Sequence, residues 1–211
     1  MSADARFWNR IAPKYAKSKI RDEEAYRYTL ERTRSYLGGG DSVLELGCGT
    51  GSTAIELARS AGRITATDLS EAMLEVGRER AWDAGADNIE FRCCSAGAAP
   101  EGPYDAVLAH NLLHLLPDLV AVLEGAAARV KPGGLFISKT PCLGEKRGSW
   151  KYWLFKAAIP LMRLAGQAPS HVEFIGIRTL EAAVERAGFK IIEAGNFPAA
   201  APSRYLVARR V

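Results

Sequence analysis

The chain has 211 residues, of which 48% are hydrophobic and 25% are charged, an ordinary composition for a globular protein that can bury a sizeable core. Its net charge of +4 is small and spread along the sequence, so nucleic acid is not expected as the main partner. The 4 cysteines form no CxxC pair, which predicts no metal site and fits a reducing cytoplasm.

The first 40 residues are expected to form two helices outside the main sheet, the clearer one over residues 25–37. They contain no apolar stretch typical of a secretory signal, so a cytoplasmic location is expected. The most membrane-like segment, residues 153–166, is interrupted by Lys156, Pro160 and Arg163 and is shorter than the ~20 residues that a spanning helix needs.

From Asp41 onward, strand-like and helix-like segments alternate. Strands are expected over residues 43–47, 63–68, 88–94, 104–111, 134–140, 189–195 and 203–211. Helices are expected over residues 70–85, with Ser70 as N-cap, 117–130 and 178–188. A further helix follows the first strand, with Ala54, Leu57, Ala58 and Ala61 on one face and Gly62 as its C-cap.

This alternation predicts an α/β fold, a Rossmann-like doubly wound sheet of seven mostly parallel strands with helices on both faces. The connection between the last two strands is too short for a crossover helix, so an antiparallel C-terminal strand is expected. Residues 131–134 read as a turn. We expect one domain over 1–211, with a helical cap over 1–40 and a helical lid inserted at 141–177 after strand five.

The segment VLELGCGTG, residues 43–51, follows a predicted buried strand and carries Gly47, Gly49 and Gly51. Glycine adopts positive φ angles and lets a ligand approach the backbone, which suits a ligand at the carboxyl edge of a parallel sheet. Asp68 ends the next strand, where a carboxylate can accept hydrogen bonds from both ribose hydroxyls. Together these residues predict a cofactor that carries a nucleoside.

The glycine spacing is GxGxG, whereas a dinucleotide site has GxGxxG, and no GxxxxGK[ST] segment for a triphosphate occurs. Glu45 precedes the first glycine by two residues, and an acidic side chain there suits a cationic ligand better than a diphosphate.

At this point the chain resembles the class I S-adenosylmethionine-dependent methyltransferases. Residues 43–51 resemble the first motif of that family, and residues 66–74, 104–118 and 129–138 resemble the segments at its second, fourth and fifth strands. The helix–strand junction at residues 178–189 matches as well, and the likeness covers about residues 10–140 and 178–211.

The resemblance implies S-adenosylmethionine as cofactor and a role for each matching residue. Gly47, Cys48 and Gly49 would pass under the methionine part, with Glu45 near its ammonium group, and Gly51 would also belong to the cofactor site. Asp68 would hold the ribose, and Leu69 and Met73 would flank the adenine. Tyr15 and Ala16 belong to a helix that would fold over the cofactor, and His110 and Asn111 would border its methionine end and the substrate pocket.

The chain departs from the family pattern at Ser95, next to Ala96, where many relatives have an aspartate for the adenine amino group. A hydroxyl accepts that hydrogen bond more weakly than a carboxylate does. No catalytic residue is assigned, because methyl transfer needs a base only when the acceptor carries a proton. His110 and His114 are the candidates for such a base, with His171 in the insertion as a more remote one; a structural role is favoured for His114.

The insertion contains the apolar residues Trp150, Trp153, Leu154, Ile159, Leu161, Met162 and Leu164 with basic residues between them. The favoured interpretation is a helix whose apolar side packs on the core. The alternatives are a wall for an apolar substrate, or contact with a membrane surface through residues 150–165.

The sequence thus predicts methyl transfer to a small, apolar metabolite, such as a quinone precursor or a lipid. Alternatives are a non-catalytic S-adenosylmethionine-binding partner protein and an NAD-dependent oxidoreductase, although the latter lacks its GxGxxG. No [DN]PP[YF]-like segment follows strand four, which disfavours methylation of nucleic-acid bases.

Overall fold

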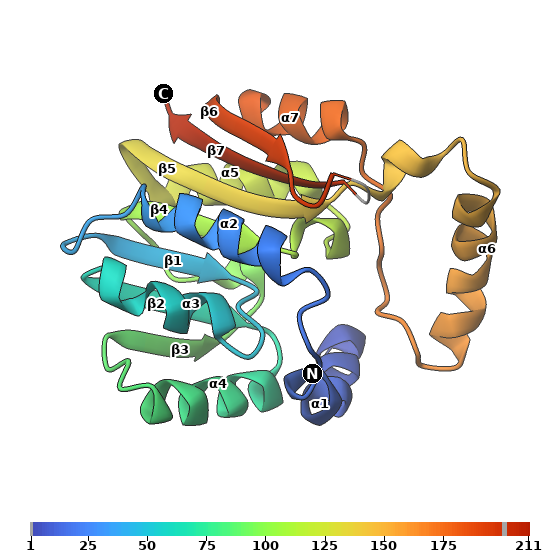
Figure 1. Cartoon of the computed structure of the whole chain (residues 1–211), viewed down its shortest axis with the longest axis horizontal. Coiled ribbons are helices and arrows are strands. Elements are labelled where there is room, and N and C mark those ends of the chain that lie inside the picture. The colour runs from blue at the N-terminus through green and yellow to red at the C-terminus, as the bar shows by residue number, and fades with distance from the viewer. Residues whose placement is uncertain (1, 200–201) are drawn as a thin grey trace.

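The computed structural model describes residues 2–199 and 202–211, apart from the side chain of Lys151. Residues 200–201, in the connection between the last two predicted strands, lie outside the described residues. A single seven-stranded sheet, with the strand order β3-β2-β1-β4-β5-β7-β6, runs through the molecule (Figure 1). Its strands are β1 (Ser42–Leu46), β2 (Arg63–Asp68), β3 (Ile89–Cys93), β4 (Tyr104–His110), β5 (Val130–Pro141), β6 (Phe189–Asn196) and β7 (Ser203–Arg210).

Strands β1 to β5 pair in parallel, and β7 pairs antiparallel with both β5 and β6. The predicted Rossmann-like sheet with an antiparallel C-terminal strand is therefore confirmed. The helices are α1 (Ala3–Ala16), α2 (Glu23–Arg34), α3 (Ser52–Leu57), α4 (Glu71–Asp83), α5 (Leu119–Arg129), α6 (Trp150–Leu164) and α7 (Ile177–Arg186). Short 3-10 helices lie at Ala58–Ser60, Ala96–Ala98, Leu113–Leu115 and Leu143–Lys146.

Each face of the sheet has its own buried cluster, because successive side chains of a strand point to opposite sides. One cluster joins Val43, Leu108 and Ile137 to Leu30 of α2 and Leu57 of α3. The other cluster packs the opposite side of the sheet against α5 and α7 (Figure 1), and it contains Leu44, Val107, Phe136, Leu123 and Leu180.

The observed caps confirm one predicted helix start and correct another. Ser70 caps α4 as expected, since its hydroxyl accepts a hydrogen bond from Met73 N at 3.2 Å. The helix expected from residue 117 begins at Leu119, because the side chain of Asp118 accepts from Ala121 N and fixes the cap there.

Two glycine predictions were wrong in detail. Gly62 is not a C-cap, since α3 ends at Leu57 and a Cβ on Gly62 would lie 3.0 Å from Gly39 O. The predicted turn at residues 131–134 lies inside β5, as an irregularity between the pairs Tyr104–Val130 and Ala106–Leu135. The extra residues bulge out of the ladder, so the local composition is turn-like although the strand continues on both sides.

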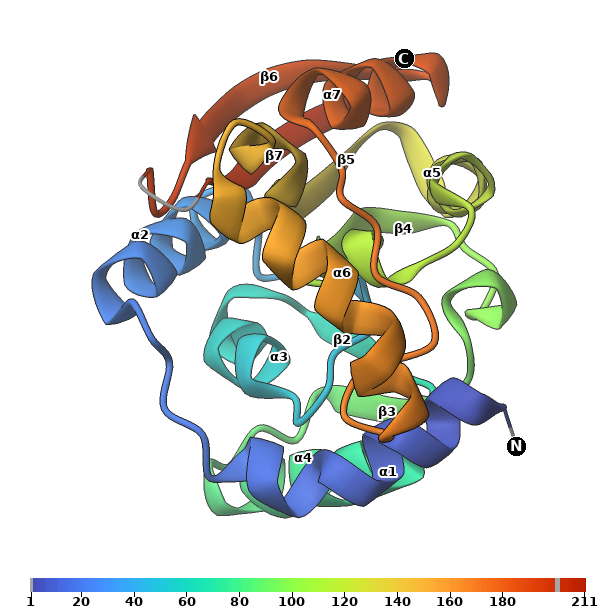
Figure 2. The ribbon, with the colours of Figure 1, turned by 90° about the vertical axis from the view of Figure 1, so that its right-hand side faces the viewer.

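The insertion and the N-terminal helix both lie at the carboxyl ends of the parallel strands. Figure 2 looks onto that edge, with α6 running across it from the side of α2 to the side of α1. The segment after α6 is tied to α1, because Ser170 N and Oγ donate to the Asp4 carboxylate at 2.7 and 2.6 Å. Arg10 also donates to Gly166 O.

Candidate functional site

The glycine loop turns sharply after β1. Gly47, Gly49 and Gly51 have φ angles of 65°, 55° and 72°, in the left-handed region that other residues rarely adopt. A Cβ on Gly51 would lie 2.9 Å from the ring of Phe91, whereas a Cβ on Gly49 would meet only Tyr15, at 3.8 Å. The loop is thus packed closely at its end and left open in its middle. The thiol of Cys48 is buried, which raises its pKa well above the usual value.

Asp68 holds the loop in this shape from the end of β2. Its carboxylate accepts hydrogen bonds from Gly49 N at 2.9 Å and Ser70 N at 2.8 Å. Burial raises the pKa of Asp68, while the backbone N–H groups of Ser70, Gly49 and Leu69 oppose this shift. Asp68 thus ends β2, as the sequence predicted, and its hydrogen bond to Gly49 N was not predicted.

Glu45 is buried within β1, with 2% of its surface exposed. Among the described residues, its Oε2 atom has no hydrogen-bond partner. Desolvation is the main cause that raises the pKa of Glu45 to about 8. The backbone N–H of Ala54 lowers this pKa, and the charge of Asp68 raises it further. A buried carboxylate oxygen without a partner is costly, so this position favours a cationic ligand group.

Helix α1 packs against α4 beside the loop. Asn9 Oδ1 accepts hydrogen bonds from Ser70 Oγ at 2.7 Å and Ala72 N at 3.2 Å, at the start of α4. Arg80 of α4 donates to the carbonyl of Ala16, at the end of α1, and to Thr50 Oγ1 of the glycine loop. These contacts bring Tyr15 over Gly49. Desolvation raises the pKa of the Tyr15 hydroxyl, and the charges of Asp68 and Glu45 add to it.

The predicted adenine side is built from the ends of β2 and β3. Met73 is almost fully buried at 2% exposure, and Leu69 is half-buried. Ser95 is exposed and Ala96 half-buried at the 3-10 helix that follows β3, and the Ser95 side chain does not cap that helix.

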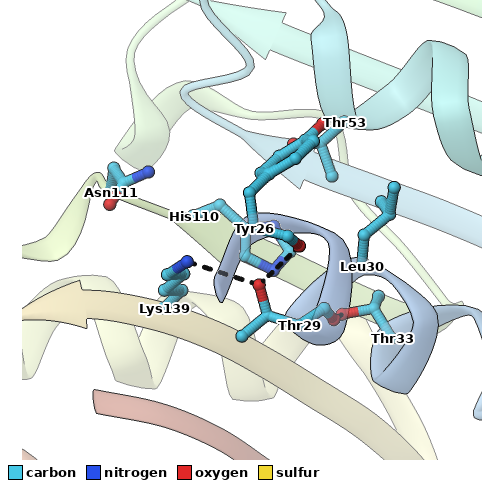
Figure 3. Close-up of a pocket in the computed structure, with 8 residues that line it drawn as sticks. All are labelled: Tyr26, Thr29, Leu30, Thr33, Thr53, His110, Asn111 and Lys139. Carbon is cyan, nitrogen blue, oxygen red and sulfur yellow. Dashed lines mark hydrogen bonds between the residues drawn. The ribbon is translucent and has the colours of Figure 1, made fainter. Parts of the chain in front are cut away.

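A polar pocket lies between α2 and the ends of β4 and β5 (Figure 3). It is lined by Tyr26, Thr29, Leu30, Thr33, Thr53, His110, Asn111 and Lys139. Thr53 follows the glycine loop by two residues, so the pocket adjoins that loop. Asn111 has a φ of 56°, and its N–H donates to Lys139 O at 2.7 Å.

Three residues that line this pocket were not predicted from the sequence: Lys139, Tyr26 and Thr29. Lys139 lies in the otherwise uncharged stretch LFISKT, and such a charge in a predicted central strand could have marked it. Tyr26 and Thr29 carried no signal, because only the packing of α2 on the sheet brings them to this edge.

The two candidate histidines are both poor bases. Burial lowers the pKa of His110 to about 4, with a smaller contribution from the positive charge of Lys139. Burial also lowers the pKa of His114 to about 4, and its carbonyl accepts from Glu173 N at 2.7 Å, which ties it to the insertion. His171, within the insertion, lies 3.5 Å from the Glu173 carboxylate.

Helix α6 does not bury its apolar side as expected. Trp153, Leu161 and Leu164 are 58%, 71% and 87% exposed. Among the described side chains of α6, only Tyr152 and Ile159 are buried, in a small cluster with Phe174 of the returning segment. The helical prediction is confirmed and the predicted packing on the core is wrong, because α6 touches its own flanking segments and lies beyond the edge of the sheet.

Among the described residues, no group of three or more His, Cys, Asp or Glu side chains could hold a metal ion. No helix in the described part of the chain is long and apolar enough to cross a membrane.

Comparison with known proteins places these features in context. Residues 43–134 match a family model described as a methyltransferase domain. A demethylmenaquinone methyltransferase from Clavibacter sepedonicus is 30% identical over 173 residues, which are 76% of this chain and 70% of that protein.

Two proteins named ubiquinone biosynthesis O-methyltransferase are also similar. The one from Paracidovorax citrulli is 38% identical over 45% of this chain and 41% of its own length. The one from Hydrogenovibrio crunogenus is 29% identical over 72% of this chain and 63% of its own length. The chain thus spans less than two thirds of both relatives.

Among solved structures, geranyl diphosphate C-methyltransferase from Streptomyces coelicolor A3(2), in complex with Mg2+, geranyl diphosphate and S-adenosyl-L-homocysteine, has a TM-score of 0.71 at 17% identity. That match covers 88% of this chain and 79% of that one. The [4+2]-cyclase SpnF has a TM-score of 0.70 at 19% identity, covering 92% of this chain and 84% of its own. At these identities the likeness shows the fold alone.

Proposed function

The chain belongs to the class I S-adenosylmethionine-dependent methyltransferases, and on that premise we propose that it transfers a methyl group from S-adenosylmethionine to a small, apolar metabolite. The observation that supports this most is the buried carboxylate of Glu45, whose Oε2 has no partner among the described residues, beside a left-handed glycine loop. A cofactor with an ammonium group would supply the missing charge partner.

We propose the following residues as the binding site. Glu45 faces the ammonium group; Gly47, Cys48, Gly49 and Gly51 form the floor; Asp68 holds the ribose hydroxyls; Tyr15 covers the loop; and Leu69, Met73, Ser95, Ala96, His110 and Asn111 complete the adenine and methionine ends. When bound, S-adenosylmethionine supplies an electrophilic methyl group on a sulfonium.

The chain's own contribution is positioning and the exclusion of water. Asp68 and the loop N–H groups are already joined by hydrogen bonds, so the ribose would meet a carboxylate whose orientation is fixed. His110 and His114 are neutral at pH 7, because their pKa values of about 4 lie far below it. The neutral imidazoles can accept a proton, but conjugate-acid pKa values of about 4 make both of them weak general bases.

The deciding experiment is calorimetric titration of the protein with S-adenosylmethionine and S-adenosylhomocysteine, with Asp68→Ala as the variant. Binding should be weakened by tenfold or more in the variant, about 1.4 kcal/mol. Asp87→Ala, at an exposed position after α4, is the matched control and should bind as the wild type does. Stabilisation by NAD without binding of either ligand would overturn the proposal, and binding without any methyl transfer would leave a cofactor-binding partner protein.

The substrate class that we propose is a quinone precursor or a related apolar ring compound. The support is the relatives named for ubiquinone and menaquinone chemistry, and the exposed apolar side chains of α6, which crosses the edge of the sheet where the pocket lies (Figure 2). A screen of hydroxylated aromatic acceptors with S-adenosylhomocysteine release as readout tests it. Turnover confined to hydrophilic acceptors would contradict this class.

We also propose that α6, with the segment that returns from it, is a lid that contacts a membrane surface. Residues 150–164 contain no acidic side chain, and Lys156 and Arg163 lie among the exposed Trp153, Leu161 and Leu164. An apolar helix with interspersed cations suits an anionic lipid surface.

Sedimentation with vesicles that contain phosphatidylglycerol tests this contact. The wild type should pellet with them, and Trp153→Glu should pellet several-fold less. Trp82→Glu, which alters an 87% exposed tryptophan on α4, is the matched control and should behave as the wild type does. Equal binding of wild type and Trp153→Glu would refute the contact.

A further inference from the structure

One face of the sheet gathers ionisable side chains at its carboxyl edge, among them Glu45, His110 and Lys139. Residues that pair across parallel strands share a face, and Glu45 of β1 pairs with Leu108 of β4. His110 lies two residues further along β4 and therefore on the same face, and it pairs directly with Lys139 of β5. Asp68 of β2 also lies on this face, and further from the edge the face is apolar, as Val43, Leu108 and Ile137 show.

Lys139 is buried, with 9% of its surface exposed, yet it has weak partners. Its Nζ donates to Ala25 O and Thr29 Oγ1, both at the long distance of 3.4 Å. Figure 3 shows the second of these hydrogen bonds. Among the described residues no carboxylate lies within ion-pair distance of it. Burying an ammonium group without a counter-charge is costly, so the pocket favours an anionic ligand atom.

The neighbours of Lys139 leave this charge available. The ionisable groups that face it from the packed elements are Asp22 and Tyr26 of α2, His110 of β4, Tyr205 of β7 and, one strand further away, Glu45 of β1. Asp22 acts only at longer range. Burial lowers the pKa of Lys139, as expected for an ammonium whose charge is not neutralised. His110 Nδ1 is also buried and has no hydrogen-bond partner in the described part of the chain, so it offers a neutral polar atom beside that charge.

We propose that Lys139 and His110 bind an acidic hydroxyl group of the methyl acceptor as its oxyanion, so that the acceptor is of the phenol class. This inference rests on the proposed function, because it places the acceptor in the pocket next to the glycine loop. The phenol releases its proton to water, and the positive charge of Lys139 stabilises the phenolate that remains, so that no strong general base is needed from either histidine. Lys139 is thereby a residue that determines which acceptors bind.

The test uses para-nitrophenol, which is coloured only as the phenolate, bound to the full chain without any cofactor. On binding to the wild type, its ionisation midpoint should fall by about one pH unit or more, as expected for an opposite charge at close range. The non-ionisable para-nitroanisole should bind about tenfold more weakly. In Lys139→Met both preferences should be lost, and Lys139→Arg should restore part of the shift.

Lys190→Met, at an exposed lysine of β6, is the matched control and should retain the wild-type midpoint. Thermal unfolding of each variant shows whether it folds, and His110→Gln provides a second variant, with the shift kept but the affinity reduced. No saturable dye binding by the wild type, or an equal midpoint shift in folded Lys139→Met, would overturn the inference. Because no cofactor is present, failure here is distinct from failure to bind S-adenosylmethionine.

Discussion

Gly49 and Gly51 share a left-handed backbone, and alanine at each should separate two costs of the glycine loop. Their φ angles are 55° and 72°, so alanine at either position costs about 1–2 kcal/mol in backbone strain. At Gly51 the new Cβ would also lie 2.9 Å from Phe91 Cε1 and 3.5 Å from Gly77 Cα. Overpacking of this kind adds about 1–3 kcal/mol. At Gly49 the nearest atom is Tyr15 Cε1 at 3.8 Å, an ordinary contact.

Gly51→Ala should therefore be less stable than Gly49→Ala by about 1–3 kcal/mol. Its melting temperature should be lower by about 2–4 °C for each kcal/mol of this difference. Any gain from a less flexible unfolded chain is the same for both substitutions and cancels in the difference. Urea unfolding followed by circular dichroism measures the stabilities, and calorimetric titration with S-adenosylhomocysteine measures binding.

The ranking should reverse in the binding experiment, because the open middle of the loop is where we place the cofactor. Gly49→Ala should lose more affinity relative to its stability than Gly51→Ala does. If the two variants are equally stable, or if Gly49→Ala is the less stable, then the packing of Gly51 against Phe91 does not constrain the loop as described.

Three further outcomes are expected. The pKa of Glu45 is raised from 4.5 to about 8, so between these pH values the folded state keeps a proton that the unfolded state loses. The free energy of unfolding should therefore fall as the pH rises through this window. Glu45→Gln should flatten this slope in urea titrations at several pH values, and an unchanged slope would contradict it. Arg129 is 7% exposed and donates to four backbone carbonyls. Its replacement by methionine should lower the free energy of unfolding by at least about 2 kcal/mol, whereas Arg186→Met, at an exposed position, should change it little. Asp4→Ala should speed limited proteolysis at residues 166–170, because it removes the contacts with Ser170. Those contacts are exposed, so the free energy of unfolding should change by less than about 1 kcal/mol. Equal cleavage rates in the two proteins would show that α1 does not anchor the insertion.

The sequence by itself determined the succession of strands and helices along the chain and the place of the candidate cofactor site. Strand and helix periodicities are local, and the expected strands and helices match the structure to within a few residues except at residues 131–134, where β5 begins earlier. The glycine loop and Asp68 were also readable, because each lies at the end of a strand and parallel strands bring such ends to one edge. Ser70 could be identified as a cap because capping is local and involves only the next three residues.

Only the tertiary structure decided which side chains meet at that edge and which stay exposed. Lys139 and His110 are 29 positions apart in the sequence, and their pairing depends on the register of β4 and β5. The apolar spacing of α6 is the same whether a core, a substrate or a lipid surface covers it. Its exposure follows from where the insertion leaves the sheet and from its attachment to α1, and neither is written in the local pattern of residues.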